Sequence, residues 1–460
     1  MASIYEGASM KQENNSKQNM LTGNPGKALF FFALPMILGN LFQQFYNMAD
    51  SMIVGQYVGE DALAAVGASY SLTTVFIMVA IGGGIGASVI TSQYLGAQSY
   101  GKMKTSIYTA LINFLIISVL LAAGGFLLNR NILTALKTPD NIIDDAVLYL
   151  EIYFCGLPFL FMYNILSAMF NALGKSKIPL GLLIFSSVLN VALDLYMVRV
   201  LEWGVAGVAI ATVIAQGISA LISFGILLWI LKRYEAEERA KLYDVEMLVR
   251  GTKIAIPSIV QQSIVSIGML LVQSVVNGFG SSVLAGYSAG MRIESICIVP
   301  MIATGNAVST FTAQNLGAGQ PERVKKGYHA GLAMIAVFAI IICVILQAFH
   351  GSIIDAFLKG DGGVEAYKTG NDYLTFISWF FALIGAKACT DGVLRGAGDV
   401  NVYMAANLVN LAFRVSFANL CAPIFGVQAV WWAVPIGWGV NFLLSFIWYR
   451  TGRWSRKRVI

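Results

Sequence analysis

Two aspartates inside long apolar stretches are the residues with the most informative chemistry. Asp50 lies in FQQFYNMADSMIVG and Asp194 lies in SSVLNVALDLYM. An ionised carboxylate at the centre of a bilayer costs about 2.5 to 3.5 kcal/mol, so each one needs a compensating partner. Gln43, Asn47 and Asp50 are spaced to share one helix face, and Asn190 stands one turn before Asp194. The spacing predicts polar faces that turn away from lipid.

These side chains have the oxygen atoms that a proton or a small hard cation prefers. Counting about 1.5 Å per helical residue places Asp194 in the outer half of the membrane, like Asp50, with Thr212 passing at a similar height on the next helix. We therefore expect one hard-oxygen site for a proton or a small hard cation, formed by Asp50, Asn190, Asp194 and Thr212. The alternative is that each aspartate is only a hydrogen-bonded group near a helix end. The presence of both Asp50 and Asp194 in the first half of the chain makes this alternative less favourable.

The elements that hold these residues are membrane-spanning helices. The chain is 57% hydrophobic and 12% charged, whereas soluble domains carry about 25% charged residues. Apolar runs of about 20 residues, long enough to cross a bilayer, recur from Ala28 to Tyr449. The predicted fold class is an all-α integral membrane protein with helices near 28–54, 62–91, 105–128, 147–172, 178–200, 204–231, 251–278, 283–312, 327–350, 369–394, 401–423 and 426–450.

The charge distribution predicts the orientation of the chain in the membrane. The net charge is +6, and Lys and Arg gather in the N-terminal tail, in alternate short loops and at the C-terminus. This positive-inside pattern places both termini in the cytosol. It also explains the basic balance without a nucleic-acid partner. The five cysteines show no metal or redox spacing, and the first 20 residues lack the apolar core of a signal peptide.

The chain contains an internal repeat. SQYLGAQSYGKMK at 92–104 matches AQNLGAGQPERVK at 313–325, an offset of about 221 residues. An even number of helices separates equivalent points, so two six-helix bundles related by a pseudo-twofold along the membrane normal are expected. The expected domains are a cytosolic tail (1–24), an N-terminal lobe (25–231), a cytosolic linker (232–250) and a C-terminal lobe (251–460). The charged stretch from Lys232 to Lys253 is expected to form an amphipathic surface helix.

Several motifs together resemble a known transporter family. LPMILGNLFQQFYNMADSMIVGQYVGEDALAAVG, SQYLGA with its repeat AQNLGA, NALGKSK with RGAGDVN, and LNVALD occur in one order over residues 25–450. The sequence is similar to the multidrug and toxic compound extrusion (MATE) family of the MOP flippase superfamily, and more specifically to its DinF-like prokaryotic branch. The resemblance implies a multi-pass bacterial inner-membrane antiporter. Such a protein exports organic, often cationic compounds in exchange for H+ or Na+ by alternating access, without a cofactor.

The resemblance also assigns roles to single residues. Asp50, Asn190, Asp194 and Thr212 match the family's coupling-ion cluster, and Asn164 is an additional candidate. Pro35 matches the first-helix proline at which a bend is expected, in agreement with the backbone donor that any proline lacks.

Side chains that could accommodate varied substrates are less specific. Apolar, aromatic and amide groups are expected to line a substrate cavity, and ordinary helix packing is the alternative for each. The residues are Gln43, Tyr46, Asn47, Phe154, Met162, Tyr163, Gln261 and Met291. The expected partners are a small organic substrate and membrane lipid, with the chain acting as a monomer.

Other polar groups at membrane depth leave alternative functions open. A lipid-linked oligosaccharide flippase would use Lys387, Arg414 and Arg292 against a pyrophosphate, but the paired acids in the first half argue against it. Lys387 and Asp391 are four residues apart and are interpreted as a structural ion pair. A third alternative is an integral membrane enzyme, but no nucleophile or metal cluster in the sequence suggests one. The run Gly82–Gly86 lies within an apolar helix and indicates close helix packing.

Overall fold

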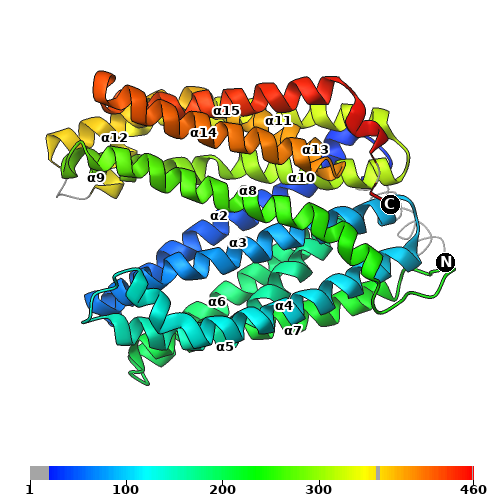
Figure 1. The fold of residues 1–460 in the computed structure, drawn as a ribbon, viewed down its shortest axis with the longest axis horizontal. Coiled ribbons are helices and arrows are strands. Elements are labelled where there is room, and N and C mark those ends of the chain that lie inside the picture. The colour runs from blue at the N-terminus through cyan, green and yellow to red at the C-terminus, as the bar shows by residue number, and fades with distance from the viewer. Residues whose placement is uncertain (1–19, 359–362, 458) are drawn as a thin grey trace, which may run out of the picture. The chain divides into compact units, whose positions relative to one another are not determined.

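The computed structural model describes residues 20–358, 363–457 and 459–460, and all regular structure among them is helical (Figure 1). The helices of the first half are α2 (Pro25–Tyr57), α3 (Glu60–Gly96), α4 (Tyr100–Ala135), α5 (Ile143–Ala172), α6 (Lys177–Arg199) and α7 (Gly204–Leu231). The second half contains α8 (Val245–Asn277), α9 (Ser281–Cys297), α10 (Val299–Gly317), α11 (Pro321–Phe357), α12 (Val364–Ile377), η1 (Ser378–Phe380), α13 (Phe381–Gly396), α14 (Val400–Phe425), α15 (Val427–Arg450) and η2 (Arg453–Arg456).

Twelve segments in the described residues are long and apolar enough to cross a membrane, which confirms the predicted fold class. Two of them consist of two consecutive helices rather than one. The span Ser281–Gly317 is interrupted at Ile298, and Pro300 follows as the second residue of α10. Proline has no N–H to donate to the preceding turn, so a helix restarts more easily at this point than it continues. The span Val364–Gly396 is interrupted by the short η1.

The chain divides into two compact units, and each division falls inside a helix. The N-terminal unit is Leu38–Ile259, and the C-terminal unit combines the residues up to Ile37 with Val260–Ile460. The division in α2 comes two residues after Pro35, and the division in α8 comes two residues after Pro257. The sequence-based lobe boundaries lie in loops instead, and the four expected domains stay a prediction.

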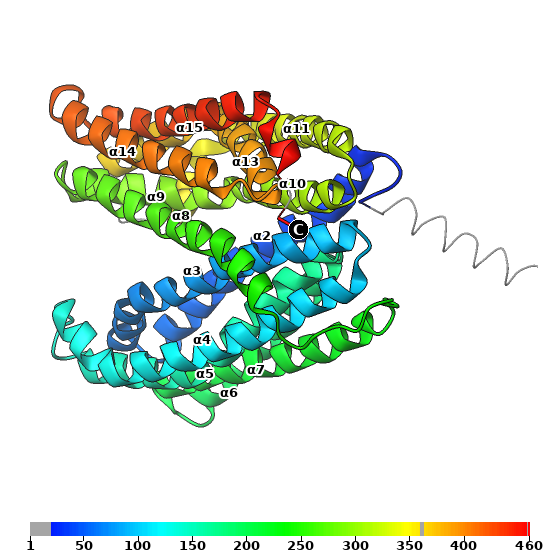
Figure 2. The same ribbon diagram turned by 45° about the vertical axis from the view of Figure 1, so that its right-hand side comes forward.

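Within the N-terminal unit, α5 is the central helix and packs against α3, α4 and α7 (Figures 1 and 2). The start of α8 approaches α3 closely. A Cβ on Gly86 would lie 2.6 Å from the Gly251 carbonyl oxygen, and one on Gly82 would lie 2.7 Å from the Ile259 Cα. The expectation that the glycine run serves helix packing is confirmed, because only glycine permits this approach of two backbones.

Within the C-terminal unit, the segment before α2 is held by polar contacts. The guanidinium group of Arg323 donates to the carbonyl oxygens of Thr22 and Gly23, each at 2.7 Å, and to that of Met20 at 3.2 Å. The Asn315 amide also donates to Met20 O at 3.2 Å. These contacts explain why the first turns of α2 belong to the unit formed by the second half of the chain.

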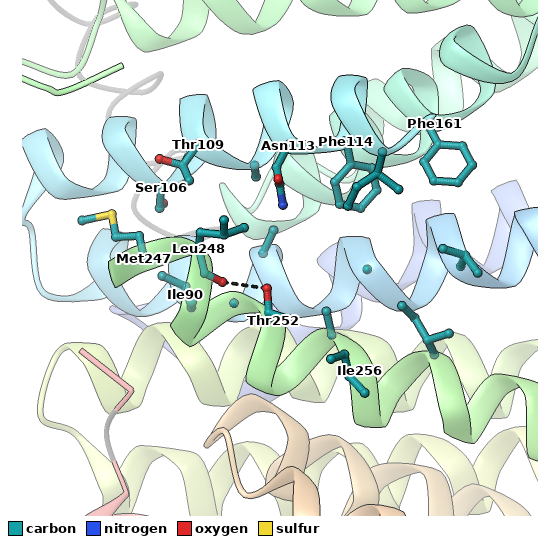
Figure 3. Close-up of a pocket in the computed structure, with 18 residues that line it drawn as sticks. Ile90, Ser106, Thr109, Asn113, Phe114, Phe161, Met247, Leu248, Thr252 and Ile256 are labelled. Atoms are coloured by element: carbon teal, nitrogen blue, oxygen red, sulfur yellow. Dashed lines mark hydrogen bonds between the residues drawn. The ribbon is translucent and has the colours of Figure 1, made fainter. Parts of the chain in front are cut away.

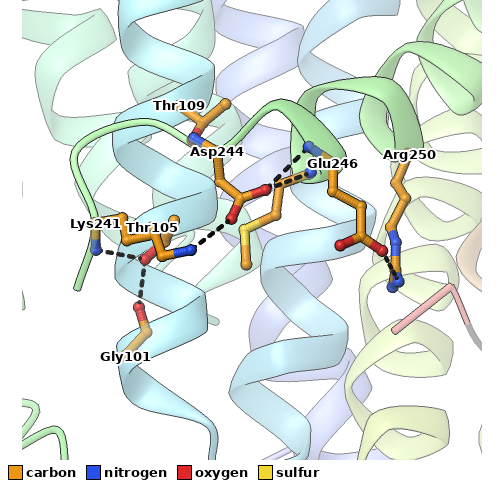
Figure 4. A network of polar contacts seen from close by, with 8 residues as sticks. Gly101, Thr105, Thr109, Lys241, Asp244, Glu246 and Arg250 are labelled. Atoms are coloured by element: carbon orange, nitrogen blue, oxygen red, sulfur yellow. Dashed lines mark hydrogen bonds and ion pairs between the residues drawn. The ribbon is translucent and has the colours of Figure 1, made fainter. Parts of the chain in front are cut away.

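The charged stretch before α8 is mostly not a helix, so the expected amphipathic helix over 232–253 is wrong for 232–244. The backbone N–H groups of Lys241 and Asp244 donate to Thr105 Oγ1 and Thr109 Oγ1 on α4, each at 3.0 Å (Figure 4). The Asp244 carboxylate then accepts the N–H of Glu246 at 3.0 Å and of Met247 at 3.1 Å. Asp244 therefore caps α8, which sets the start of the helix.

The same contacts determine the protonation of Asp244. The hydrogen bond from the Met247 N–H is the largest influence, and Lys241 Nζ lies 3.6 Å from Oδ2. Both favour the ionised carboxylate, so the pKa of Asp244 is lowered below its ordinary value.

Candidate ion site in the N-terminal unit

Three helices of the N-terminal unit bring five polar side chains together. Tyr46 and Asp50 come from α2, Asn190 and Asp194 from α6, and Thr212 from α7, against which α6 packs. On α2 and on α6 the two polar residues are four positions apart and therefore lie one turn above each other. The two helices present matching pairs, in which Tyr46 meets Asn190 and Asp50 meets Asp194.

The two carboxyl groups are hydrogen-bonded to each other. Two ionised carboxylates this close would repel each other, whereas one proton between them would let one acid donate to the other. Asp194 is fully buried and Asp50 is half-buried. The Oδ1 atom of each has no hydrogen-bond partner in the described part of the chain. The pair thus has unused oxygen lone pairs that a proton or a small cation could occupy.

Asn190 connects the acid pair to the other two helices. The amide orientation that satisfies both of its groups places Nδ2 3.1 Å from Asp194 Oδ2 and within hydrogen-bonding distance of the Tyr46 hydroxyl. Its oxygen then accepts the backbone N–H of Thr212 at 3.1 Å. Thr212 Oγ1 donates to the Val208 carbonyl oxygen at 3.0 Å. The amide is 98% buried, since only 2% of Asn190 is exposed, so these bonds replace the ones that water would make.

A small cavity lies beside Thr212. Its volume is about 10 Å³, which is close to the room that one water molecule needs. Tyr149, Tyr153 and Gln216 contribute the other polar side chains of its wall. Tyr149 on α5 is near enough to Asp50 and Asp194 to interact with both electrostatically. The cluster therefore holds carboxyl, amide, hydroxyl and phenol oxygens around two acids, the donor set expected for H+ or Na+.

A family model described as MatE matches the chain twice, over residues 35–196 and 257–420. The two matches fall on the two halves of the internal repeat. The chain belongs to the MATE family. This membership confirms the resemblance, and because MATE proteins are transporters it excludes the enzyme alternative.

Relatives of this MATE transporter cover nearly its whole length. It is 32% identical over 443 residues to the probable multidrug resistance protein YpnP of Bacillus subtilis, covering 95% of this chain and 97% of the relative. It is 27% identical over 447 residues to the probable multidrug resistance protein YoeA of the same organism, at 94% and 95% coverage. Among solved structures, a MATE protein in complex with MaL6 superimposes with a TM-score of 0.89 at 22% identity, covering 95% of this chain and 98% of that one, which shows the fold.

Two further residues assigned by the resemblance lie outside the cluster. Asn164 is on α5, and its Nδ2 donates to the Leu160 carbonyl oxygen of the same helix at 2.9 Å. Pro35 lies within α2, which is helical from Pro25 to Tyr57, and belongs to the C-terminal unit. Their roles in coupling and bending stay predictions.

The expected substrate-cavity residues are spread over both units, and their role in a cavity stays a prediction. Phe154 is 1% exposed and packs edge-on against Phe76 with centroids 5.4 Å apart, as helix packing would require. Gln43 donates to the Asn47 Oδ1 at 2.9 Å along α2. Met162 and Tyr163 are half-buried on α5. Gln261 and Met291 belong to the C-terminal unit.

Tyr46 was expected in the substrate cavity, and the structure places it against Asn190 in the ion cluster. The matched spacing of Tyr46 with Asp50 and of Asn190 with Asp194 is a signal in the sequence that would have grouped them. Tyr149 offered no such signal, because it lies on a helix that the spacing does not relate to the acids.

A larger cavity in the N-terminal unit contains none of the residues expected from sequence. It has a volume of about 170 Å³ and lies between α3, α4 and the start of α8. Figure 3 shows Asn113 extending from α4 into the space beside Thr252, with Phe114 and Phe161 at the other end. The lining is mostly apolar side chains on separate helices. Each would be read from sequence as ordinary packing, and only the fold groups them.

Proposed function

We propose that this MATE transporter exports organic compounds in exchange for H+ or Na+, with Asp50 and Asp194 as the residues that bind the coupling ion. The hydrogen bond between the two carboxyl groups is the observation that carries the proposal. Relatives named as multidrug resistance proteins support the export of organic compounds.

The coupling follows from charge. With a proton shared between them, Asp50 and Asp194 attract each other and hold α2 against α6. Loss of that proton leaves two adjacent negative charges, which repel unless Na+ takes the proton's place. The ion therefore favours the packing of α2 against α6, and its release favours another packing. An antiporter arises when the substrate binds better to the second packing than to the first.

The remaining parts of the proposal concern the cellular setting. Apolar spans and the family place the chain in a membrane as a multi-pass protein. We propose the bacterial inner membrane with both termini in the cytosol, in agreement with the distribution of Lys and Arg. We also propose that one chain is the transporting unit and that transport needs no cofactor.

Gradient-driven transport in proteoliposomes tests the ion site. Efflux of ethidium is measured under an imposed pH gradient and, separately, under a Na+ gradient. Asp50→Asn, Asp194→Asn and the double variant are compared with the wild type, and each single variant should lose at least tenfold in gradient-driven rate. Asp145→Asn is the matched control, because Asp145 is an exposed acid at the start of α5. Undiminished gradient-driven efflux in the double variant would remove the proposal.

Two of the three basic residues that suggested the flippase alternative give it no support. Lys387 Nζ lies 3.1 Å from Asp391 Oδ2, as the interpretation of a structural ion pair expected. Arg292 is exposed on α9. Neither is available as part of a converging basic pocket, which a pyrophosphate would require.

A further inference from the structure

The second half of the chain carries an arginine at the place where the first half carries a coupling acid. VLNVALD at 188–194 on α6 aligns with LVNLAFR at 408–414 on α14, and both helices are the fifth span of their half. Asn410 corresponds to Asn190, and Arg414 corresponds to Asp194. Arg414 is about 21 Å from the Val400 end of α14, hence well inside the membrane.

Side chains from two other helices of the C-terminal unit interact with Arg414, and a third helix adds a ring that packs beside them. Glu294 and Tyr287 come from α9, Tyr373 from α12 and Trp431 from α15; with Arg414 they form what we call the Arg414 cluster. The Tyr373 hydroxyl donates to Glu294 Oε2, and both side chains are buried. The ring centroids of Tyr287 and Tyr373 are 5.1 Å apart, and those of Tyr373 and Trp431 are 5.9 Å apart.

The charge of Arg414 is not neutralised by a direct partner. It interacts electrostatically with Glu294 and with the Tyr287 hydroxyl. However, Arg414 makes no ion pair within 4.0 Å with any acid in the described ranges of the chain. A charged side chain at membrane depth without such a partner is unfavourable, and it therefore indicates a functional site.

Two donors of the cluster have no acceptor. Arg414 Nε is buried and lacks a hydrogen-bond partner among the described residues, and the same holds for Trp431 Nε1. Only 5% of Trp431 is exposed, so water does not readily replace the missing acceptor. The guanidinium and indole N–H groups can only donate. The Tyr287 hydroxyl and Asn410 Oδ1 also have no hydrogen-bond partner among the described residues, but neither oxygen is charged. What the cluster lacks is therefore an anionic oxygen acceptor for an arginine without an ion pair.

We propose that the Arg414 cluster binds the carboxylate group of a transported compound, so that the substrates include zwitterionic or monoanionic organic acids. The inference rests on the proposed export function and specifies its substrate class. A planar carboxylate matches the fork of donors on a guanidinium group. A phosphate dianion fits less well, because the cluster offers one arginine and already contains the acid Glu294.

A substrate carboxylate can reach the Arg414 side chain. Arg414 and Asn410 are half-buried rather than fully enclosed, so part of each side chain can be reached. Gly437 on α15 lets α14 approach closely, because a Cβ there would lie 2.3 Å from Asn410 Oδ1 and 3.4 Å from Arg414 Cβ.

Binding of two dyes that differ only in one carboxylate tests the proposal. Rhodamine B has a free carboxylate, and its ethyl ester does not. Fluorescence anisotropy is measured while each dye is titrated with the full chain in lipid nanodiscs, with empty nanodiscs as background. The wild type should bind rhodamine B about tenfold more tightly than the ester. Arg414→Gln should reduce this ratio to about one, with the affinity for the ester unchanged.

Further variants separate recognition from folding. Arg414→Lys, which keeps the charge but loses the fork, and Trp431→Phe, which removes one donor, should each lower the ratio about threefold. Arg292→Gln removes an exposed arginine from α9 and should leave the ratio of the two dye affinities unchanged. Equal binding of both dyes by the wild type would overturn the proposal, as would a ratio that none of the cluster variants alters. The assay uses no ion gradient, so failure of coupled transport would contradict the export function and leave this site intact.

Discussion

Tyr46 on α2 and Asn190 on α6 are joined by a side-chain hydrogen bond although 144 positions separate them in the chain. The bond lies one turn from the hydrogen bond between Asp50 and Asp194. Two helices that are distant in sequence are therefore connected at two successive levels. The tyrosine orients the amide that in turn reaches Asp194, which links Tyr46 to the affinity of the site.

Tyr46→Phe should weaken ion binding without removing the acids. It leaves the buried Asn190 amide without one of its partners, a loss of about 1 to 3 kcal/mol. The ion concentration that gives half-maximal exchange in proteoliposomes should rise about tenfold. Tyr70→Phe is the control, since Tyr70 is 64% exposed on α3. An unchanged half-saturation in Tyr46→Phe would show that the tyrosine does not support the site.

Asp244→Ala should destabilise the chain by about 1 kcal/mol at neutral pH, because the start of α8 loses its cap. The pKa of Asp244 is lowered in the folded protein, so the contribution of its charge is fully present above the ordinary value of 3.8 and is lost as the pH falls through the lowered folded value. Thermal unfolding in detergent at pH 7, 5 and 3 measures the difference from wild type. The difference in stability between Asp244→Ala and wild type should be equal at pH 7 and 5 and smaller at pH 3.

Asp244→Asn separates capping from charge. An asparagine caps a helix about as well as an aspartate but does not titrate. This variant should be nearly as stable as wild type at pH 7 and should lose less stability than wild type on going to pH 3. A stability gap for Asp244→Ala that stays constant through pH 3 would argue against the charge of this carboxylate.

Gly86→Ala should lower the melting temperature. The added methyl group would lie 2.6 Å from the Gly251 oxygen and 2.7 Å from the Ala255 nitrogen, both of which are backbone atoms that cannot turn aside. Overpacking of this kind costs about 1 to 3 kcal/mol. Gly67→Ala on the same helix has no atom within 4 Å of the new methyl group and should be neutral or slightly stabilising. A similar response of both variants would mean that the close approach of α3 and α8 is not needed.

Lys387→Met should be more harmful than Lys387→Met combined with Asp391→Asn. The two side chains are 13% and 6% exposed and lie 3.1 Å apart, and Ser445 also donates to Asp391 Oδ1 at 2.7 Å. Removing the lysine alone leaves a buried carboxylate without its partner, at about 3 to 5 kcal/mol. Melting temperatures of both variants measure this difference. A double variant that is no more stable than the single one would show that the pair is not a neutralising unit.

The sequence by itself determined the membrane class, the twelve spans and the internal repeat, and it identified Asp50 and Asp194 as acids at membrane depth. Hydrophobic length and charge placement are local properties of a chain, because each span must satisfy its own backbone hydrogen bonds in lipid. The twofold match of the family model confirms the repeat. The stretch 232–244 before α8 was wrongly expected to be a helix, because two of its backbone N–H groups donate to the hydroxyls of Thr105 and Thr109 on another helix.

Only the tertiary structure decided which side chains meet. Asp50 and Asp194 are separate signals in the sequence, and the packing of α2 against α6 makes them neighbours. Tyr46 moved from an expected substrate wall to the ion cluster for the same reason. Arg414 was considered for a flippase from the sequence, and the fold brings an acid from α9 and tyrosines from α9 and α12 near it. A contact depends on the rotation and approach of whole helices, which hydrophobic patterns do not specify.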